Sequence, residues 1–384
     1  MSIVTCNGLT VRGPRDHRLR ACRAITCREE IDLPFNRKFV LGRRGLIAAA
    51  TVAPLARPHV ARAEPTTLVL GTNGGEEYKT MYEAVYSNFE KKYNARIVPV
   101  YGDGATLLNK VLAERANPSM DAVVTYQGGW DIGKAEGVFE KVDFSAIPNS
   151  DKIYEFMRDK SGYGPYCNFT AWGICYNKDE IKKPPTSFKD LWKPEYKGQL
   201  MVGGIYHWQI HLTAFAHAWA GDQSKIDVAF AKMKELAPNL AGFYGLTSDA
   251  QSKFQQGVGN MATWYSRTVQ RLNAAGIPLA FQTPEEGAFI YPIAYQAVKG
   301  TKKLDLVQKL MGEMYDPAAS VKLAELNGYI PGNREVKLPP ALQKGMLTYD
   351  EVLKANSWDW TLINKDQDTW LARWNGEIRP LLKG

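Results

Sequence analysis

The stretch FTAWGICYNKDEI at Phe169–Ile181, followed closely by PPTSFKDL at Pro184–Leu191, decides the fold of this chain. Its first part is rich in aromatic and β-branched residues, and we expect one extended strand over residues 168–176. Its second part places Ser187 three residues before Asp190, which is typical of a capped helix start. A long apolar strand that leads into a capped helix predicts the point where one α/β segment ends and another begins.

Before this stretch, short apolar runs alternate with helical patterns. The runs at residues 66–71, 96–101 and 121–125 have the composition of strands, and apolar residues recur at helical spacing after the first two. A further helix is expected to start within 133–138. Such alternation predicts a mainly parallel sheet with helices on both faces.

After this stretch, elements of the same kinds recur. We expect a helix over residues 208–219, a long apolar strand over 289–298 and a helix near 304–314. Near the C-terminus, Trp370 and Trp374 lie at helical spacing. Two α/β lobes joined by extended strands are therefore the expected architecture.

The formal net charge of +8 is concentrated at the N-terminus. Residues 1–63 contain 12 Lys and Arg residues against 4 Asp and Glu residues, so the remaining residues are electrically balanced. A balanced body exerts no general attraction on phosphate backbones. The charge distribution therefore argues against nucleic acid as a partner.

Residues 1–63 have the features of an export leader. Two arginines at 43–44 precede an apolar run of 11 residues at 46–56, which is short for a membrane span of about 20 residues. The A-x-A pattern at 61–63 fits cleavage by signal peptidase, so we expect a periplasmic protein whose leader is removed near Ala63. The arginine pair resembles a twin-arginine signal. A general-secretory signal stays open because Gly42 stands where Ser or Thr is usual.

The chain after the leader keeps two cysteines, Cys167 and Cys175. An even pair in an oxidising compartment favours a disulfide. If both residues lie in one extended strand, however, their Cα atoms are about 26 Å apart, whereas a disulfide needs about 5.5 Å. The sequence leaves both states of this pair open.

Several segments resemble the bacterial extracellular solute-binding proteins of ABC importers, in the branch that includes spermidine/putrescine and ferric-iron binders. The strand ending in YNKD at 176–179, with Pro184–Leu191 after it, resembles the crossing between the two lobes in that family. The segments WKPEYKG at 192–198, AELNGYIPGN at 324–333 and the stretch 121–140 resemble further family segments in the same order.

The resemblance implies a type II periplasmic binding fold of α/β class, with two lobes and a ligand cleft between them. Each lobe is expected to be a mainly parallel sheet flanked by helices. Lobe 1 would comprise residues 64–170 plus 296–335, and lobe 2 residues 171–295 plus 336–384. The hinges would lie near 169–173 and 290–295. The implied partners are a small-molecule ligand and the permease subunits of an ABC transporter; a monomer without a cofactor is expected.

In the family that this chain resembles, ligand residues follow the carboxyl ends of strands, as the crevice rule for α/β sheets predicts. Aromatic walls bury methylene chains or stack on rings, and a few polar groups fix the orientation. Carried over position by position, the implied ligand-binding residues are Thr72, Asn73, Glu76, Tyr126, Gln127, Trp130, Tyr206, His207, Trp208, Trp264, Tyr265, Arg267 and Tyr291.

Arg267 distinguishes this chain from the polyamine branch, whose second lobe supplies carboxylates. The segment 203–209 has no acidic residue, and Arg267 stands where an acid would neutralise an amine. An unpaired arginine favours an anionic or zwitterionic ligand. Two alternatives remain open: Arg267 points to solvent or pairs with a structural acid, and Trp264 packs in the core. The ligand is expected to be a small polar organic solute that is polyamine-like, amino-acid-like, or a carboxylate or phosphonate.

A ferric-iron-binding protein is the main alternative. Tyr265, together with Tyr126 and Tyr291, offers phenolate ligands of the kind used by the ferric branch. His207 and His211 are four residues apart and could share a helix face for zinc. The glutamate that a hydrolytic zinc motif needs after the first histidine is absent, so we expect no metal site at these histidines.

An enzyme on the same fold is the remote alternative. A thiaminase-like activity would need Cys167 as nucleophile and a base such as Glu286. The sequence contains no G-x-S-x-G, P-loop or dinucleotide-binding pattern. We therefore expect a binding protein without enzymatic activity. A sensor subunit would bind its ligand by the same physics and would differ only in its partner.

Overall fold

The strand expected at 168–176 is β4, Tyr166–Asn177, in the computed structural model. The structure describes residues 64–204, 207–245, 247–343 and 345–381, and all of them belong to the second of two units, 1–60 and 61–384. The expectations about the leader and about Tyr206 concern residues outside these ranges. Among the described helices, none is both long enough and apolar enough to cross a membrane.

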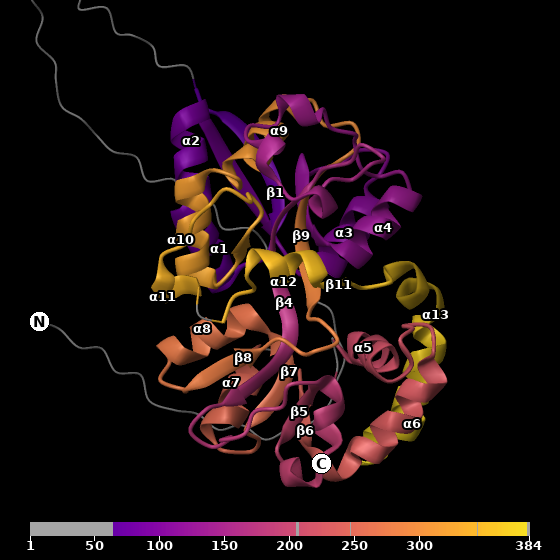
Figure 1. Ribbon diagram of the computed structural model, residues 1–384. Helices are drawn as coiled ribbons and strands as arrows, with labels where there is room; N and C mark the ends of the chain where they lie inside the picture. Colours follow the sequence, from indigo (N-terminus) through magenta and orange to yellow (C-terminus); the bar gives the residue numbers. More distant parts are fainter. Residues whose placement is uncertain (1–63, 205–206, 246, 344, 382–384) are drawn as a thin grey trace, which may run out of the picture. The chain divides into compact units, whose positions relative to one another are not determined.

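One mixed sheet runs through the described part of the chain (Figure 1). The strand order is β2 (Ala95–Tyr101), β1 (Thr66–Thr72), β3 (Ala122–Tyr126), β9 (Phe289–Ala297), β4, β7 (Met261–Tyr265), β5 (Leu200–Gly203) and β6 (Leu240–Tyr244). The pairs β1–β2, β1–β3, β5–β6 and β5–β7 are parallel. The pairs β3–β9, β9–β4 and β4–β7 are antiparallel.

Strand β4 joins the two halves of this sheet. Its residue Phe169 is paired by β9 on one edge and by β10 (Ile330–Pro331) on the other. Five residues further on, Ile174 is paired by β7 and by β8 (Leu279–Gln282). The same strand is therefore a central strand in each half, and it runs between them through the middle of Figure 1.

Helices cover both faces of the sheet in the first half, as the alternating pattern predicts. One apolar cluster packs the sheet against α1 (Gly75–Met81), a π-helical turn (Tyr82–Tyr86), α2 (Ser87–Tyr93), α9 (Leu304–Glu313) and α10 (Pro317–Asn327). A second cluster packs the sheet against α3 (Gly104–Ala113), α4 (Gln127–Ala135) and α12 (Tyr349–Lys354). In Figure 1, α1, α2 and α10 lie to one side of β1 and β9, and α3 and α4 lie to the other side.

A third apolar cluster forms the core of the second half. Along β4 the clusters change between Ala171 and Trp172, and along β9 they change between Phe289 and Ile290. The exact limits of the two lobes remain a prediction. The α-helices of this half are α5 (Trp208–Ala220), α6 (Ile226–Leu236), α7 (Thr247–Gln255), α8 (Ser266–Ala274) and α13 (Trp360–Arg373). The remaining described strand and α-helix are β11 (Asn356–Ser357) and α11 (Pro340–Gln343).

Two local expectations can be compared directly with the structure. The capping box is present, with Ser187 and Asp190 at the start of a short 3-10 helix, Phe188–Trp192. The helix expected from 133 instead begins at Gln127, directly after β3. The glycines at 128 and 129 are part of this helix, and Gly128 packs so closely that a Cβ atom there would lie 2.5 Å from the Trp360 ring.

Both cysteines of β4 are free and buried. Burial raises the pKa of the Cys167 thiol to about 12 and also raises the pKa of Cys175. Both residues lie in the one extended strand β4, so their Cα atoms are too far apart for a disulfide. The structure therefore has the reduced state of the pair.

Candidate functional site

A cavity of about 740 Å³ opens where the two halves of the sheet meet. The first half contributes residues that follow the carboxyl ends of the parallel strands β1, β2 and β3, as the crevice rule requires. The second half contributes the first residues of α5 and α8. The lining residues are Asn73, Asp103, Gly104, Ala105, Thr106, Asn109, Val124, Thr125, Tyr126, Thr170, His207, Gln209, Ile210, Tyr265, Arg267, Tyr291, Ile293, Tyr329 and Trp360.

Four aromatic rings form a continuous wall of this cavity. Tyr126 and Tyr291 are nearly parallel, with ring centroids 6.0 Å apart, and the Tyr265 ring lies 5.1 Å from Tyr291. Trp360 is the first residue of α13, and the centre of its ring lies 5.4 Å from that of Tyr126. Burial raises the pKa of all three phenols, so they are neutral at physiological pH. Such a wall can bury the apolar part of a small ligand.

Five polar side-chain atoms of the lining residues are buried and have no hydrogen-bond partner within the described protein. A buried polar group without a partner costs about 1–3 kcal/mol, and such groups in native proteins call for an explanation. Their chemistry is mixed: the indole N–H only donates, the amide oxygen accepts, and hydroxyls do both. The atoms are Thr125 Oγ1, His207 Nδ1, Gln209 Oε1, Tyr265 OH and Trp360 Nε1.

The two histidines near the start of α5 are uncharged. Burial lowers the pKa of His207 to about 4 and that of His211 to about 3. His211 Nδ1 lies 2.7 Å from the His207 carbonyl, to which only an N–H can donate, and Nε2 then accepts from Gly203 N–H and the Thr263 hydroxyl. His211 is thus a satisfied core residue. No three His, Cys, Asp or Glu side chains within the described ranges are grouped to hold a metal ion.

Arg267 lines the cavity and is paired with an acid. Its Nη1 lies 3.2 Å from Glu77 Oε2, and its guanidinium lies over the Tyr329 ring at 5.2 Å. Tyr329 OH donates to Glu77 Oε1 at 2.7 Å, and Asn327 Nδ2 lies 3.4 Å from the same oxygen. The alternative in which Arg267 pairs with a structural acid is therefore the observed one. Its charge alone gives no reason to expect an anionic ligand.

Asp103 is the other charged residue among the described lining residues. It caps α3, where its carboxylate accepts from the backbone N–H of Thr106 at 2.8 Å. This hydrogen bond lowers the pKa of Asp103 below its usual value. The carboxylate is exposed at the wall of the cavity, on the side formed by the first half of the sheet.

The structure describes twelve of the thirteen residues predicted from the sequence; six of these twelve line the cavity and six do not. Thr72 is buried at the end of β1, Glu76 is exposed beside Lys79, and Gln127 starts α4 outside the lining. Trp130, Trp208 and Trp264 pack on Tyr166, Trp374 and Tyr244, respectively, and Tyr206 lies outside the described residues. The six that line the cavity are Asn73, Tyr126, His207, Tyr265, Arg267 and Tyr291.

Several lining residues were not predicted from the sequence. Asp103 follows the second strand, so the crevice rule applied to that strand would have found it. Gln209 lies two residues after a predicted one. Tyr329 lies in the segment 324–333, which resembles a family segment but was not predicted to contact the ligand. Trp360 had no local signal, because only the tertiary fold brings it to the cavity.

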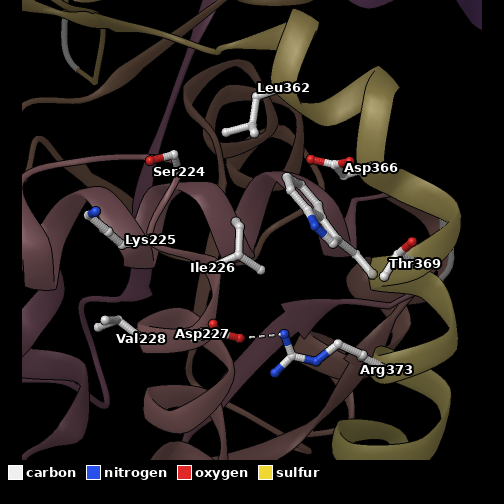
Figure 2. Close-up of a pocket in the computed structure, with 10 residues that line it drawn as sticks. Ser224, Lys225, Ile226, Asp227, Val228, Leu362, Asp366, Thr369 and Arg373 are labelled. Atoms are coloured by element: carbon white, nitrogen blue, oxygen red, sulfur yellow. Dashed lines mark hydrogen bonds and ion pairs between the residues drawn. The ribbon is translucent and has the colours of Figure 1, made fainter.

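A second hollow of about 420 Å³ lies between α6 and α13 (Figure 2). Its arginine is already paired: Arg373 Nη1 lies 2.7 Å from Asp227 and Nε lies 2.8 Å from Glu377. The Arg373 guanidinium also lies 3.9 Å from the centre of the Phe230 ring. Because Arg373 is already paired with its own neighbours, this hollow is a weaker candidate for a ligand site than the cavity at β4.

A cavity between two α/β halves, joined by β4 and β9 and lined from both sides, defines a two-lobed solute-binding protein. Comparison with known proteins supports this class. The sequence profile of the family described as "Bacterial extracellular solute-binding protein" matches residues 132–354. The chain belongs to this family. The predicted family and fold class are thereby confirmed.

Individual relatives and solved structures are similar over most of the chain. The spermidine/putrescine-binding periplasmic protein of Escherichia coli (strain K12) is 24% identical over 295 residues, which cover 73% of this chain and 80% of that protein. The crystal structure of an ABC transporter from Clostridium perfringens matches with a TM-score of 0.71 and 25% identity, covering 81% of this chain and 100% of that chain. An ABC transporter substrate-binding protein from Bradyrhizobium japonicum gives a TM-score of 0.70 at 19% identity, over 82% and 100%.

Proposed function

We propose that this protein captures a small polar organic solute in the cavity at β4 and delivers it to the membrane permease of an ABC importer. The observation that carries the proposal is the set of five buried polar atoms without partners in residues that line the cavity. A ligand that pairs with them would remove their desolvation cost. The family membership supports the solute-binding role, and the relatives named as ABC transporter proteins support the partner.

Closure of the two halves would give the ligand its affinity. The lining residues come from both halves, so a closed form makes contacts to the ligand that an open form lacks, and the ligand shifts the population towards closure. The segments 169–173 of β4 and 290–295 of β9 would act as hinges, and the predicted lobe limits follow from them. The permease would recognise the closed form of a monomer in the periplasm.

The two alternatives have less support. Iron would have to displace protons from Tyr126, Tyr265 and Tyr291, whose pKa values burial raises. In a thiaminase-like enzyme Cys167 would be the nucleophile, but it is fully buried and does not line the cavity. Glu286, its candidate base, accepts hydrogen bonds from Ser187 and from the backbone N–H of Phe188. We propose a protein that binds and releases its solute unchanged.

A thermal-shift screen followed by calorimetry tests this function. The panel contains polyamines, amino acids, carboxylates, phosphonates, thiamine and Fe³⁺. A true ligand raises the melting temperature by mass action on the folded state, and one of the organic solutes is expected to do so in a saturable manner. Stabilisation by Fe³⁺ alone, or turnover of thiamine, would contradict the proposal.

A further inference from the structure

The ion pair between Glu77 and Arg267 has a consequence for ligand choice. Among the described lining residues, Arg267 is the only cation at neutral pH, because burial keeps His207 uncharged. Glu77 lies beneath it in α1 and is not part of the lining. The side chains of Arg267 and Glu77 are 23% and 17% exposed, respectively, so water screens their charges only partly.

The carboxylate of Glu77 is held in place by groups other than the arginine. Tyr329 OH and Asn327 Nδ2 both point to its Oε1, and Asn327 is itself fixed by the Thr80 hydroxyl at 2.7 Å. Glu77 therefore cannot move away easily when another anion approaches Arg267. A ligand carboxylate that approaches Arg267 would find the guanidinium charge already neutralised by Glu77. The Glu77 carboxylate would also repel it.

We infer that Glu77 sets the charge selectivity of the cavity by neutralising Arg267, so that the ligand group bound at this end is uncharged or cationic. The inference rests on the proposed function and narrows its ligand class. Arg267 then serves as a hydrogen-bond donor to a neutral oxygen. The one unmatched formal charge on the described wall is the carboxylate of Asp103, which favours an amine elsewhere in the same ligand.

Three probes with the same four-carbon chain test this inference: putrescine, 4-aminobutan-1-ol and 4-aminobutanoate. The wild-type protein is expected to bind the diamine or the amino alcohol more tightly than the amino acid. Glu77→Gln removes the masking charge and should tighten binding of 4-aminobutanoate by about tenfold, because one partly buried like charge has been removed. Isothermal titration calorimetry gives the affinities.

Two control variants separate charge from structural damage. Glu76→Gln makes the same charge change one residue away, at an exposed side chain that pairs only with Lys79 in the structure, and should leave all three affinities within about twofold. The double variant Glu77→Gln with Arg267→Gln should lose the gain for 4-aminobutanoate. If the double variant keeps that gain, the gain does not come from unmasking Arg267 and the inference is wrong.

Other outcomes also decide the matter. Tighter binding of 4-aminobutanoate than of 4-aminobutan-1-ol by the wild type would overturn the inference without any variant, even if Glu77→Gln does not fold. Failure of Glu77→Gln to gain affinity while the other probes still bind would overturn the inference and leave the proposed function standing. If no probe and no member of the solute panel binds any of these proteins, both the proposed function and the inference fail.

Discussion

Replacing Tyr265 by Phe tests whether its hydroxyl binds the ligand. The same replacement at Tyr244, whose hydroxyl has a structural role, is a matched control. Both hydroxyls are buried in the second half of the sheet, and both rings pack against aromatic neighbours. Tyr265 lines the cavity and its OH has no partner. Tyr244 lies outside the cavity lining, and its OH donates to the Thr263 carbonyl at 2.6 Å.

The two variants are expected to change different quantities: Tyr265→Phe should weaken ligand binding, and Tyr244→Phe should lower stability. Tyr265→Phe removes an unpaired buried hydroxyl, so the unliganded protein should be as stable as the wild type or more stable. The ligand would lose one hydrogen bond and leave its own polar group unpaired, which costs about 1–3 kcal/mol or about 5- to 150-fold in affinity. Tyr244→Phe should cost about 1–3 kcal/mol of unfolding free energy and leave the affinity unchanged.

Chemical denaturation of the unliganded proteins gives the first quantity, and calorimetry with the best solute from the screen gives the second. The reasoning is refuted if Tyr265→Phe destabilises the unliganded protein as much as Tyr244→Phe does, since the Tyr265 hydroxyl would then have a partner within the protein. It is also refuted if both variants bind the solute as tightly as the wild type.

Three further predictions concern pH, packing and the thiols. Because burial lowers the pKa of His211 from 6.5 to about 3, the unfolded chain takes up a proton first on acidification; stability should be complete above pH 6.5 and fall as the pH drops towards 3. His211→Asn should weaken that dependence between pH 6.5 and 4 in denaturation experiments, and the remaining dependence should come from His207, whose pKa burial lowers to about 4. An unchanged dependence in the variant would contradict the prediction. Gly133→Ala should lower the unfolding free energy by about 1–3 kcal/mol, because a Cβ atom there would lie 2.2 Å from the Phe139 ring, while Gly376→Ala, which meets nothing within 4 Å, should not destabilise. The two thiols of β4 should resist alkylation, followed by mass spectrometry, until the protein unfolds, and rapid labelling of the native protein would contradict their burial.

The fold could be predicted to a large extent because its signals are local. Strands β1, β2, β3 and β9 begin and end within two residues of the expected positions. The helix after β3 begins earlier than predicted. Two successive glycines disfavour a helix, but here Gly128 allows Trp360 to pack against α4. That contact joins residues more than 200 positions apart, and no local pattern reveals it.

The site could be predicted only in part, for a similar reason. Tyr126 and Tyr265 end their strands, so the crevice rule finds them. Glu76 was predicted as a ligand residue, but its neighbour Glu77 is the one that reaches Arg267. Adjacent residues on a helix point about 100° apart, and the sequence does not reveal which of two neighbouring glutamates faces inwards. The partner of Arg267, on which the ligand argument depends, was therefore not visible before the fold was known.

The place of β9 in the sheet also constrains biosynthesis. Strand β3 is complete at residue 126, yet its neighbour β9 extends to residue 297. While the ribosome makes the 170 or so intervening residues, the emerging chain carries an unprotected strand edge of the kind that promotes aggregation. A nascent chain of this protein therefore has reason to be shielded by a chaperone until late in translation, and its first half cannot fold to completion before its second half has been made.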